Sequence, residues 1–206
     1  MYKRQDYSGF KSKIAKYLAR TDLTDEIPDF IQLAEIQLQR DIRTKKLLGV
    51  AQASTTASDS KVGLPTDFLE MRDIHIQSTN PLGTIKFKSP NNFYKSADTT
   101  FSGQPVYYTV LATEIQLAPI PDTSYTLQML YYKSPTLLSD SNITNVFLTN
   151  YQDALLWAAC AEGDTFLMND SRLNMWAARY DRAILKINEA GQSSEFGGEP
   201  ITMAYQ

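Results

Sequence analysis

Apolar residues recur at helical spacing near both ends of the chain and at strand spacing in the middle. Near the N-terminus this pattern predicts a helix over residues 8–19 and a second helix that starts after Asp25. Near the C-terminus it predicts a third helix that begins at Thr149, in capping-box spacing with Gln152, and a fourth with Gly191 at its C′ position. Each helix has an apolar face to bury, so we expect the two pairs to pack on each other.

The middle of the chain consists of short β-branched and aromatic runs separated by glycine and proline. Such runs are typical of a small antiparallel sandwich or barrel. The alternation slips near Asp73, which predicts a bulge or a change of face. Residues 84–88 alternate cleanly and predict one strand, and residues 89–97 predict a short helical turn. Residues 49–60 are small and polar, and they predict an edge strand that leads into a turn.

This order of segments predicts an α+β fold: an antiparallel helical bundle into which a small antiparallel β domain is inserted. Residues 1–48 and 146–191 are expected to form the bundle, and residues 49–145 the inserted domain. Residues 192–206 have no period but carry spaced apolar side chains. We interpret them as an extended tail that docks on a partner, and a frayed terminus is the alternative.

Charge and hydropathy argue against several classes of protein. The chain has 206 residues and a net charge of −3, which argues against a protein that binds nucleic acid irrespective of sequence. The densest basic stretch, residues 40–46, falls at the end of a predicted helix, where cations complement exposed carbonyls. A weak patch at these residues that faces DNA is the alternative interpretation. No apolar run approaches the roughly 20 residues of a membrane span, and the first residues lack the apolar core of a secretory signal.

Few residues could support catalysis. The one cysteine, Cys160, lies in an apolar run and is expected to be a small buried hydrophobe. The one histidine, His75, alternates with two isoleucines and is expected on the outer face of a sheet. One histidine and one cysteine exclude a cysteine-rich zinc site, and the chain has no nucleotide-binding glycine motif. We therefore predict no catalytic residue, no metal and no cofactor.

Carboxylates offer one enzymatic alternative. Asp67, Glu70 and Asp73 are close in sequence, and paired carboxylates can hydrolyse glycosides. Turn formation after a proline accounts for Asp67, and solvated strand positions account for the other two. The cell-wall hydrolase is therefore the weakest of the functions considered.

Apolar and aromatic residues outside the expected core suggest interfaces. The second helix is apolar on more than one side, and two tyrosine pairs lie in predicted strands, so that one ring of each pair faces outward. Exposed strand tyrosines suit protein contacts or sugar stacking. We predict a subunit or tail interface at Leu33, Ile36, Tyr107, Tyr108, Tyr131 and Tyr132.

Several stretches occur in an informative order along the chain. These are residues 64–68 (LPTDF), 117–121 (LAPIP) and 131–137 (YYKSPTL), then the alanine-rich helix with Tyr151 and the helix with Trp176 and Tyr180. In this order and spacing the chain resembles the head–tail adaptor family of tailed bacteriophages, similar to the tail tubular protein A of short-tailed phages.

The resemblance implies a structural, non-enzymatic protein of the virion, made in the host cytoplasm. About twelve copies would form a ring beneath the portal protein. The ring would extend the channel through which genomic DNA passes without sequence-specific binding, and would dock a tail nozzle or fibre protein. The portal-binding tail would use Phe196, Glu199, Pro200, Ile201, Met203 and Tyr205. The alternative is a carbohydrate-binding or fibre-attachment module of a phage tail, in which exposed tyrosines stack on glycans.

Overall fold

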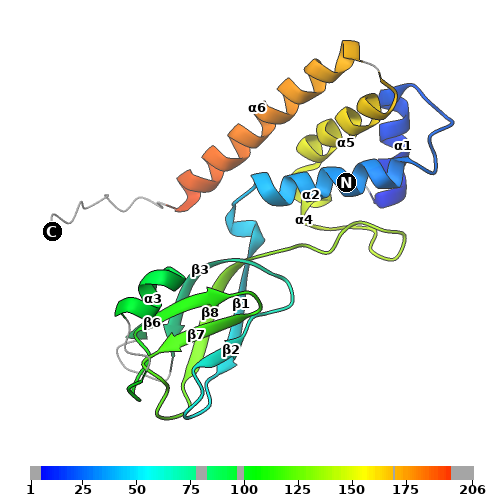
Figure 1. The fold of residues 1–206 in the computed structure, drawn as a ribbon. Helices are drawn as coiled ribbons and strands as arrows, with labels where there is room; N and C mark the ends of the chain where they lie inside the picture. The colour runs from blue at the N-terminus through cyan, green and yellow to red at the C-terminus, as the bar shows by residue number, and fades with distance from the viewer. Residues whose placement is uncertain (1–5, 78–82, 97–99, 169, 196–206) are drawn as a thin grey trace. The chain divides into compact units, whose positions relative to one another are not determined.

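The computed structural model describes residues 6–77, 83–96, 100–168 and 170–195. They form six α-helices, one short 3-10 helix and eight strands, an α+β fold (Figure 1). The chain divides into two compact units. We call Met1–Leu47 with Pro135–Gln206 the helical unit and Leu48–Ser134 the β unit. Residues 135–145, which we expected in the β domain, belong to the helical unit.

The helical unit brings together helices from both ends of the sequence. Its elements are α1 (Tyr7–Leu18), α2 (Ile27–Asp41), η1 (Lys45–Leu47), α4 (Val146–Asn150), α5 (Gln152–Phe166) and α6 (Asp170–Glu195). Helix α5 contacts α1, α2, α4 and α6. Its residues 154–160 are buried apart from Trp157, as expected for a run that is apolar on all sides. Helices from the two ends of the sequence are therefore in contact, as the apolar faces led us to expect.

Two helix starts show how local chemistry sets the boundaries. Asp6 caps α1, and its carboxylate accepts a hydrogen bond from the Gly9 N–H at 2.8 Å. Asn145 caps α4 in the same way. The predicted capping box at Thr149 is therefore wrong, because α4 has already started at Val146. The non-helical backbone of Tyr151 then separates α4 from α5.

Gly191 was predicted to end the fourth helix, and this prediction is wrong. Helix α6 continues through it to Glu195, so residues 192–195 are helical and not part of an extended tail. A Cβ atom at Gly191 would lie 3.2 Å from Thr44 Cγ2 and 3.4 Å from the Arg43 carbonyl oxygen. The glycine lets α6 pass close to the backbone that follows α2.

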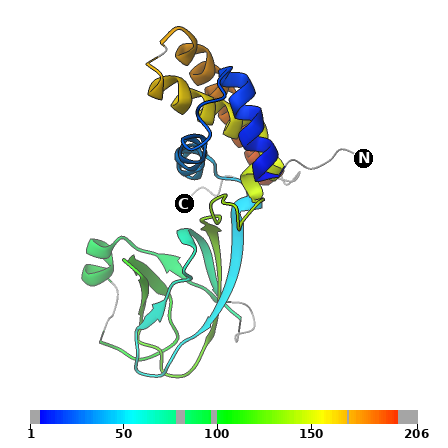
Figure 2. The same ribbon diagram turned by 90° about the vertical axis from the view of Figure 1, so that its right-hand side faces the viewer.

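The β unit contains two four-stranded sheets (Figure 2). One sheet has the order β1-β8-β3-β4, formed by Leu48–Ser54, Thr126–Lys133, Phe68–Ile76 and Gly83–Thr84. The other has the order β2-β7-β6-β5, formed by Lys61–Gly63, Glu114–Ala118, Tyr107–Leu111 and Lys86–Phe87. All pairings are antiparallel except β5 with β6. The short helix α3 (Pro90–Ser96) contacts β6, where the sequence predicted a helical turn.

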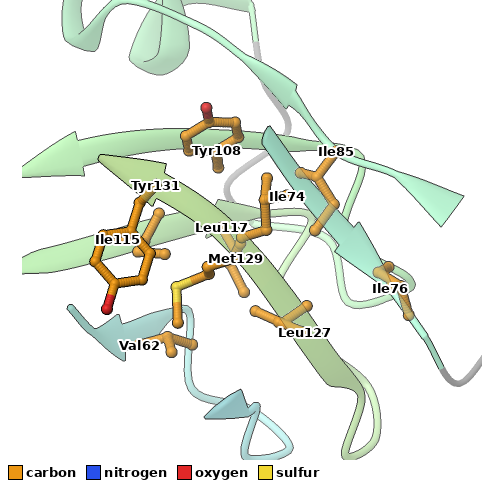
Figure 3. Close-up of a cluster of buried hydrophobic side chains, with 10 residues drawn as sticks. All are labelled: Val62, Ile74, Ile76, Ile85, Tyr108, Ile115, Leu117, Leu127, Met129 and Tyr131. Carbon is orange, nitrogen blue, oxygen red and sulfur yellow. The ribbon is translucent and has the colours of Figure 1, made fainter. Parts of the chain in front are cut away.

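Inward-facing side chains of both sheets form one core (Figure 3). Alternate positions of β3, β7 and β8 point inward, as the period of two predicts. The buried members are Val62, Ile74, Ile76, Ile85, Tyr108, Ile115, Leu117, Leu127, Met129 and Tyr131. This is the packing of a small sandwich.

Two details of the strands test the sequence pattern. The pairing of β3 with β8 shifts register between Met71 and Asp73, which confirms the irregularity predicted there. The single strand expected over residues 84–88 is wrong. The chain pairs with β3 up to Thr84, buries Ile85, and pairs with β6 from Lys86 onward. Burying Ile85 between the sheets divides the run into β4 and β5.

Candidate functional site

A groove runs along α6 in the helical unit. One hollow of about 470 Å³ is lined by residues that follow α2, by the α4–α5 junction and by the C-terminal half of α6. A second hollow of about 300 Å³ adjoins it and shares Asp153, Ala183 and Lys186. We call the two together the basic groove.

The charge of the basic groove is opposite to that of the chain. Its lining includes one carboxylate, Asp153, and five cations: Lys45, Lys46, Arg179, Arg182 and Lys186. The chain as a whole carries a net charge of −3. Clustered charge of one sign in a concave surface attracts groups of the opposite sign. The groove therefore suits an anionic or acidic partner.

Two features bring the cations of the groove together: the periodicity of α6, and the close approach of α6 to Thr44. Arg179, Arg182 and Lys186 stand at positions i, i+3 and i+7 of α6, which places them on one face. The lysines of η1 join them because Gly191 allows α6 to lie close to Thr44. The Lys46 ammonium donates a hydrogen bond to Asn150 Oδ1 at 2.7 Å, which ties η1 to α4.

Hydrogen bonds fix the walls of the groove. The hydroxyls of Thr44 and Tyr151 are 2.6 Å apart and buried. The Tyr180 hydroxyl donates to Asp41 Oδ2 at 2.6 Å, and Asn188 Nδ2 donates to the Asp41 carbonyl oxygen at 3.0 Å. Burial, followed by the hydrogen bond to Asp41, raises the pKa of Tyr180, so it stays a donor at neutral pH. The end of α2 is therefore held firmly to α6.

An aromatic cluster stabilises the other end of the groove. The rings of Trp157 and Trp176 are stacked with centroids 5.5 Å apart, and the Arg179 guanidinium lies 4.9 Å from the Trp157 centroid. The Trp176 indole N–H donates to the buried Asp164 at 2.6 Å, and Arg172 pairs with the same carboxylate at 2.9 Å. These contacts hold Arg179 along the groove.

The model of one protein family matches almost the whole chain. The SU10 adaptor protein family matches residues 5–203, which include both the helical unit and the β unit. The chain belongs to this family. Family membership makes it a structural adaptor of a bacteriophage and supports the head–tail adaptor resemblance. A search of curated proteins finds no match to the chain.

The predicted interface residues of the adaptor differ in accessibility. On α2, Leu33 is 50% exposed and Ile36 is half-buried. In the β unit, Tyr107 and Tyr132 are half-buried. Interface roles for these four residues remain predictions.

The other tyrosine of each strand pair packs in the core of the β unit. Tyr108 and Tyr131 are each only 5% exposed, so the expectation that they present an interface is not met by their position. The Tyr131 hydroxyl donates to Asp67 Oδ1 at 2.8 Å. Burial and this hydrogen bond raise the pKa of Tyr131 to about 12.

The tail residues predicted to bind the portal lie outside the described residues. They are Phe196, Glu199, Pro200, Ile201, Met203 and Tyr205, and their role remains a prediction.

The titratable residues singled out in the sequence have structural partners. His75 Nε2 is 2.9 Å from Asp73 Oδ2, on the face opposite the buried Ile74 and Ile76. Burial raises the pKa of the Cys160 thiol to about 12, which keeps it protonated and unreactive at neutral pH. In the part of the chain that the structure describes, no group of three or more His, Cys, Asp or Glu side chains could hold a metal ion. Over the same residues, no helix has the length and apolar character that a membrane crossing needs.

The sequence pattern did not reveal the basic groove. The spacing of Arg179, Arg182 and Lys186 was a usable signal, because these residues share one helical face. Lys45 and Lys46 were interpreted as helix-end cations. Their place beside α6 follows from contacts between residues about 140 positions apart.

Proposed function

We propose that the adaptor forms a ring of about twelve copies beneath the portal protein at the head–tail interface of a phage particle. The ring extends the DNA channel and carries the next tail component, a nozzle or fibre protein. The observation behind this proposal is the family match over residues 5–203, since a match of that extent covers nearly every element of the fold.

We assign different roles to the two units. We propose that the helical unit acts as an antiparallel bundle that forms the ring, and that the β unit is an inserted domain directed to the next tail component, as in the tail tubular protein A of short-tailed phages. A ring of identical head-to-tail contacts needs two different surfaces on each subunit. Leu33, Ile36, Tyr107 and Tyr132 are apolar or aromatic side chains with the accessibility that such contacts require.

The C-terminal segment is the proposed portal contact. Phe196, Ile201, Met203 and Tyr205 are spaced apolar anchors within eleven residues that follow α6. A segment that becomes ordered on docking loses conformational entropy, and contacts with the partner offset that loss only when the partner is present. Binding of the tail would therefore link ring formation to a completed portal.

Genomic DNA passes through the proposed channel without sequence-specific binding. The net charge of −3 favours sliding of DNA over tight association. Of the four strand tyrosines, Tyr107 and Tyr132 are accessible enough to stack on a glycan, but the family match favours an adaptor over the carbohydrate-binding alternative.

Electron microscopy of the portal protein mixed with the adaptor tests the proposal. We expect an added layer on one face of the portal ring, with the rotational symmetry of the portal. Portal particles that look the same with and without an excess of adaptor would contradict it.

A further inference from the structure

We propose that the basic groove of one copy receives the acidic start of α2 from the next copy. We call Asp25, Glu26 and Asp29, together with the neighbouring Leu33 and Phe166, the acidic end. This inference rests on the proposed ring, and it names the contact that closes it.

The acidic end carries carboxylates that make no ion pair with the described residues. Arg20 Nε donates a hydrogen bond to Asp22 Oδ1 at 2.7 Å, so Asp22 already has a partner. Among the described residues, Asp25, Glu26 and Asp29 form no ion pair. Glu26 is the N-cap residue of α2, yet its side chain makes no capping hydrogen bond within those residues. These carboxylates are therefore available to a partner.

The acidic end also exposes apolar surface. Phe166 is 56% exposed, although its ring packs on Phe30 with centroids 5.5 Å apart. Leu33 lies one turn further along α2 and is 50% exposed. Carboxylates beside apolar side chains form a surface that matches a groove with basic walls and an apolar floor.

The basic groove has that composition. Its floor includes Ala183 and Ile187. On its wall, Arg182 and Lys186 are exposed and form no ion pair with any residue that the structure describes. Guanidinium and ammonium groups can pair with the carboxylates while the apolar parts bury each other.

Within one copy, α2 holds the acidic end apart from the lysines of η1 that line the basic groove. The acidic end lies at the start of α2, whereas η1, with Lys45 and Lys46, follows the end of that helix. A rigid helix of 15 residues separates them by about 22 Å. Complementary surfaces at opposite ends of one element favour a head-to-tail contact, which repeats to give a closed ring.

Charge reversal tests the contact directly. We expect Arg182→Glu with Lys186→Glu, or Asp25→Lys with Asp29→Lys, to raise the adaptor concentration needed for half-maximal ring formation on portal at least about tenfold, because like charges then face each other. A chain that carries all four substitutions restores opposite charges and should recover most of the loss. Wild-type ring formation by either pair alone would overturn the proposal.

Two controls make the result specific. Lys86→Glu with Lys95→Glu changes the net charge by the same amount at exposed positions of the β unit, and it should assemble like the wild type. Circular dichroism and thermal unfolding of every variant show whether the fold is kept. If the groove variant loses retention of duplex DNA but forms rings normally, the groove serves DNA and the proposal is overturned.

A cross-link separates this inference from the proposed function. Adaptor with Lys186→Cys and adaptor with Asp29→Cys, mixed at high concentration with a mild oxidant and without portal, should form a disulfide-linked dimer. Cysteines at Lys86 and Lys95 serve as the control pair. Dimers without rings on portal would refute the proposed function but not the contact. Rings without dimers would refute the contact but not the function.

Discussion

The buried carboxylate of Glu35 on α2 accepts a hydrogen bond from the backbone N–H of Leu138, 2.9 Å away. Its other oxygen accepts one from the Asn145 side chain, which also caps α4. One residue of α2 therefore holds the segment between the β unit and α4. This contact explains why residues 135–145 belong to the helical unit.

Glu35→Ala should destabilise the protein by about 1–3 kcal/mol, because the Leu138 N–H and the Asn145 amide then lose their acceptor. Burial, as the main cause, raises the pKa of Glu35, so the folded state holds this proton more tightly than the unfolded chain. Its contribution to stability is thus full below the unfolded pKa and is lost as pH rises through the folded pKa. Urea unfolding from pH 4.5 to 8 should show the stability of wild type falling, as pH rises, relative to Glu35→Gln, which does not titrate at this position. A relative stability of wild type that grows with pH would contradict this account.

Tyr180→Phe should cost about 1–3 kcal/mol, because it leaves Asp41 without the hydroxyl donor 2.6 Å away. The measurement is the free energy of unfolding by denaturant titration. Tyr17→Phe is the control, since Tyr17 is partly exposed and its ring contacts Trp157 and Trp176 in T-shaped geometry. Equal effects of the two substitutions would show that the contact between α2 and α6 is not held by this hydrogen bond.

Ile85→Ala should cost about 2–5 kcal/mol, because it opens a cavity between the two sheets of the β unit. Ile85 is 2% exposed, whereas Val50 on the edge strand β1 is 59% exposed. Val50→Ala should therefore change stability by about 0.5 kcal/mol or less. Thermal unfolding of both variants tests the prediction, and a similar loss in both would mean that Ile85 does not join the sheets as described.

Removal of residues 196–206 should leave the fold intact and abolish binding to portal. The truncated chain retains all of α6, including Gly191 and its close approach to Thr44. Circular dichroism and the unfolding temperature check the fold, and co-sedimentation with portal checks binding. Tight portal binding by the truncated chain would exclude the tail as the docking element.

Local signals in the sequence were sufficient for much of the fold. The apolar periods predicted α1, α2 and α6 to within a few residues at most of their ends, and the broken alternation at Asp73 marked the register shift. The errors have a common physical cause. The predictions at Gly191 and Ile85 used only their neighbours in sequence. Their roles depend on distant residues, because Gly191 lies against Thr44 and Ile85 is buried against the opposing sheet.

The basic groove shows the same limit. Its cations come from η1 and from α6, and only the packing of α2 against the C-terminal helices brings them to one surface. Single helix faces can be predicted from a period of 3.6 residues, whereas a surface shared by distant segments cannot.

The mass of the purified adaptor in solution, alone and with portal protein, tests the central claim most directly. Light scattering should detect added adaptor of roughly 280 kDa per portal ring, about twelve copies of the 23.2 kDa chain. An adaptor that stays at its own mass beside an excess of portal, with no complex formed, would contradict the claim that this chain forms a ring on portal.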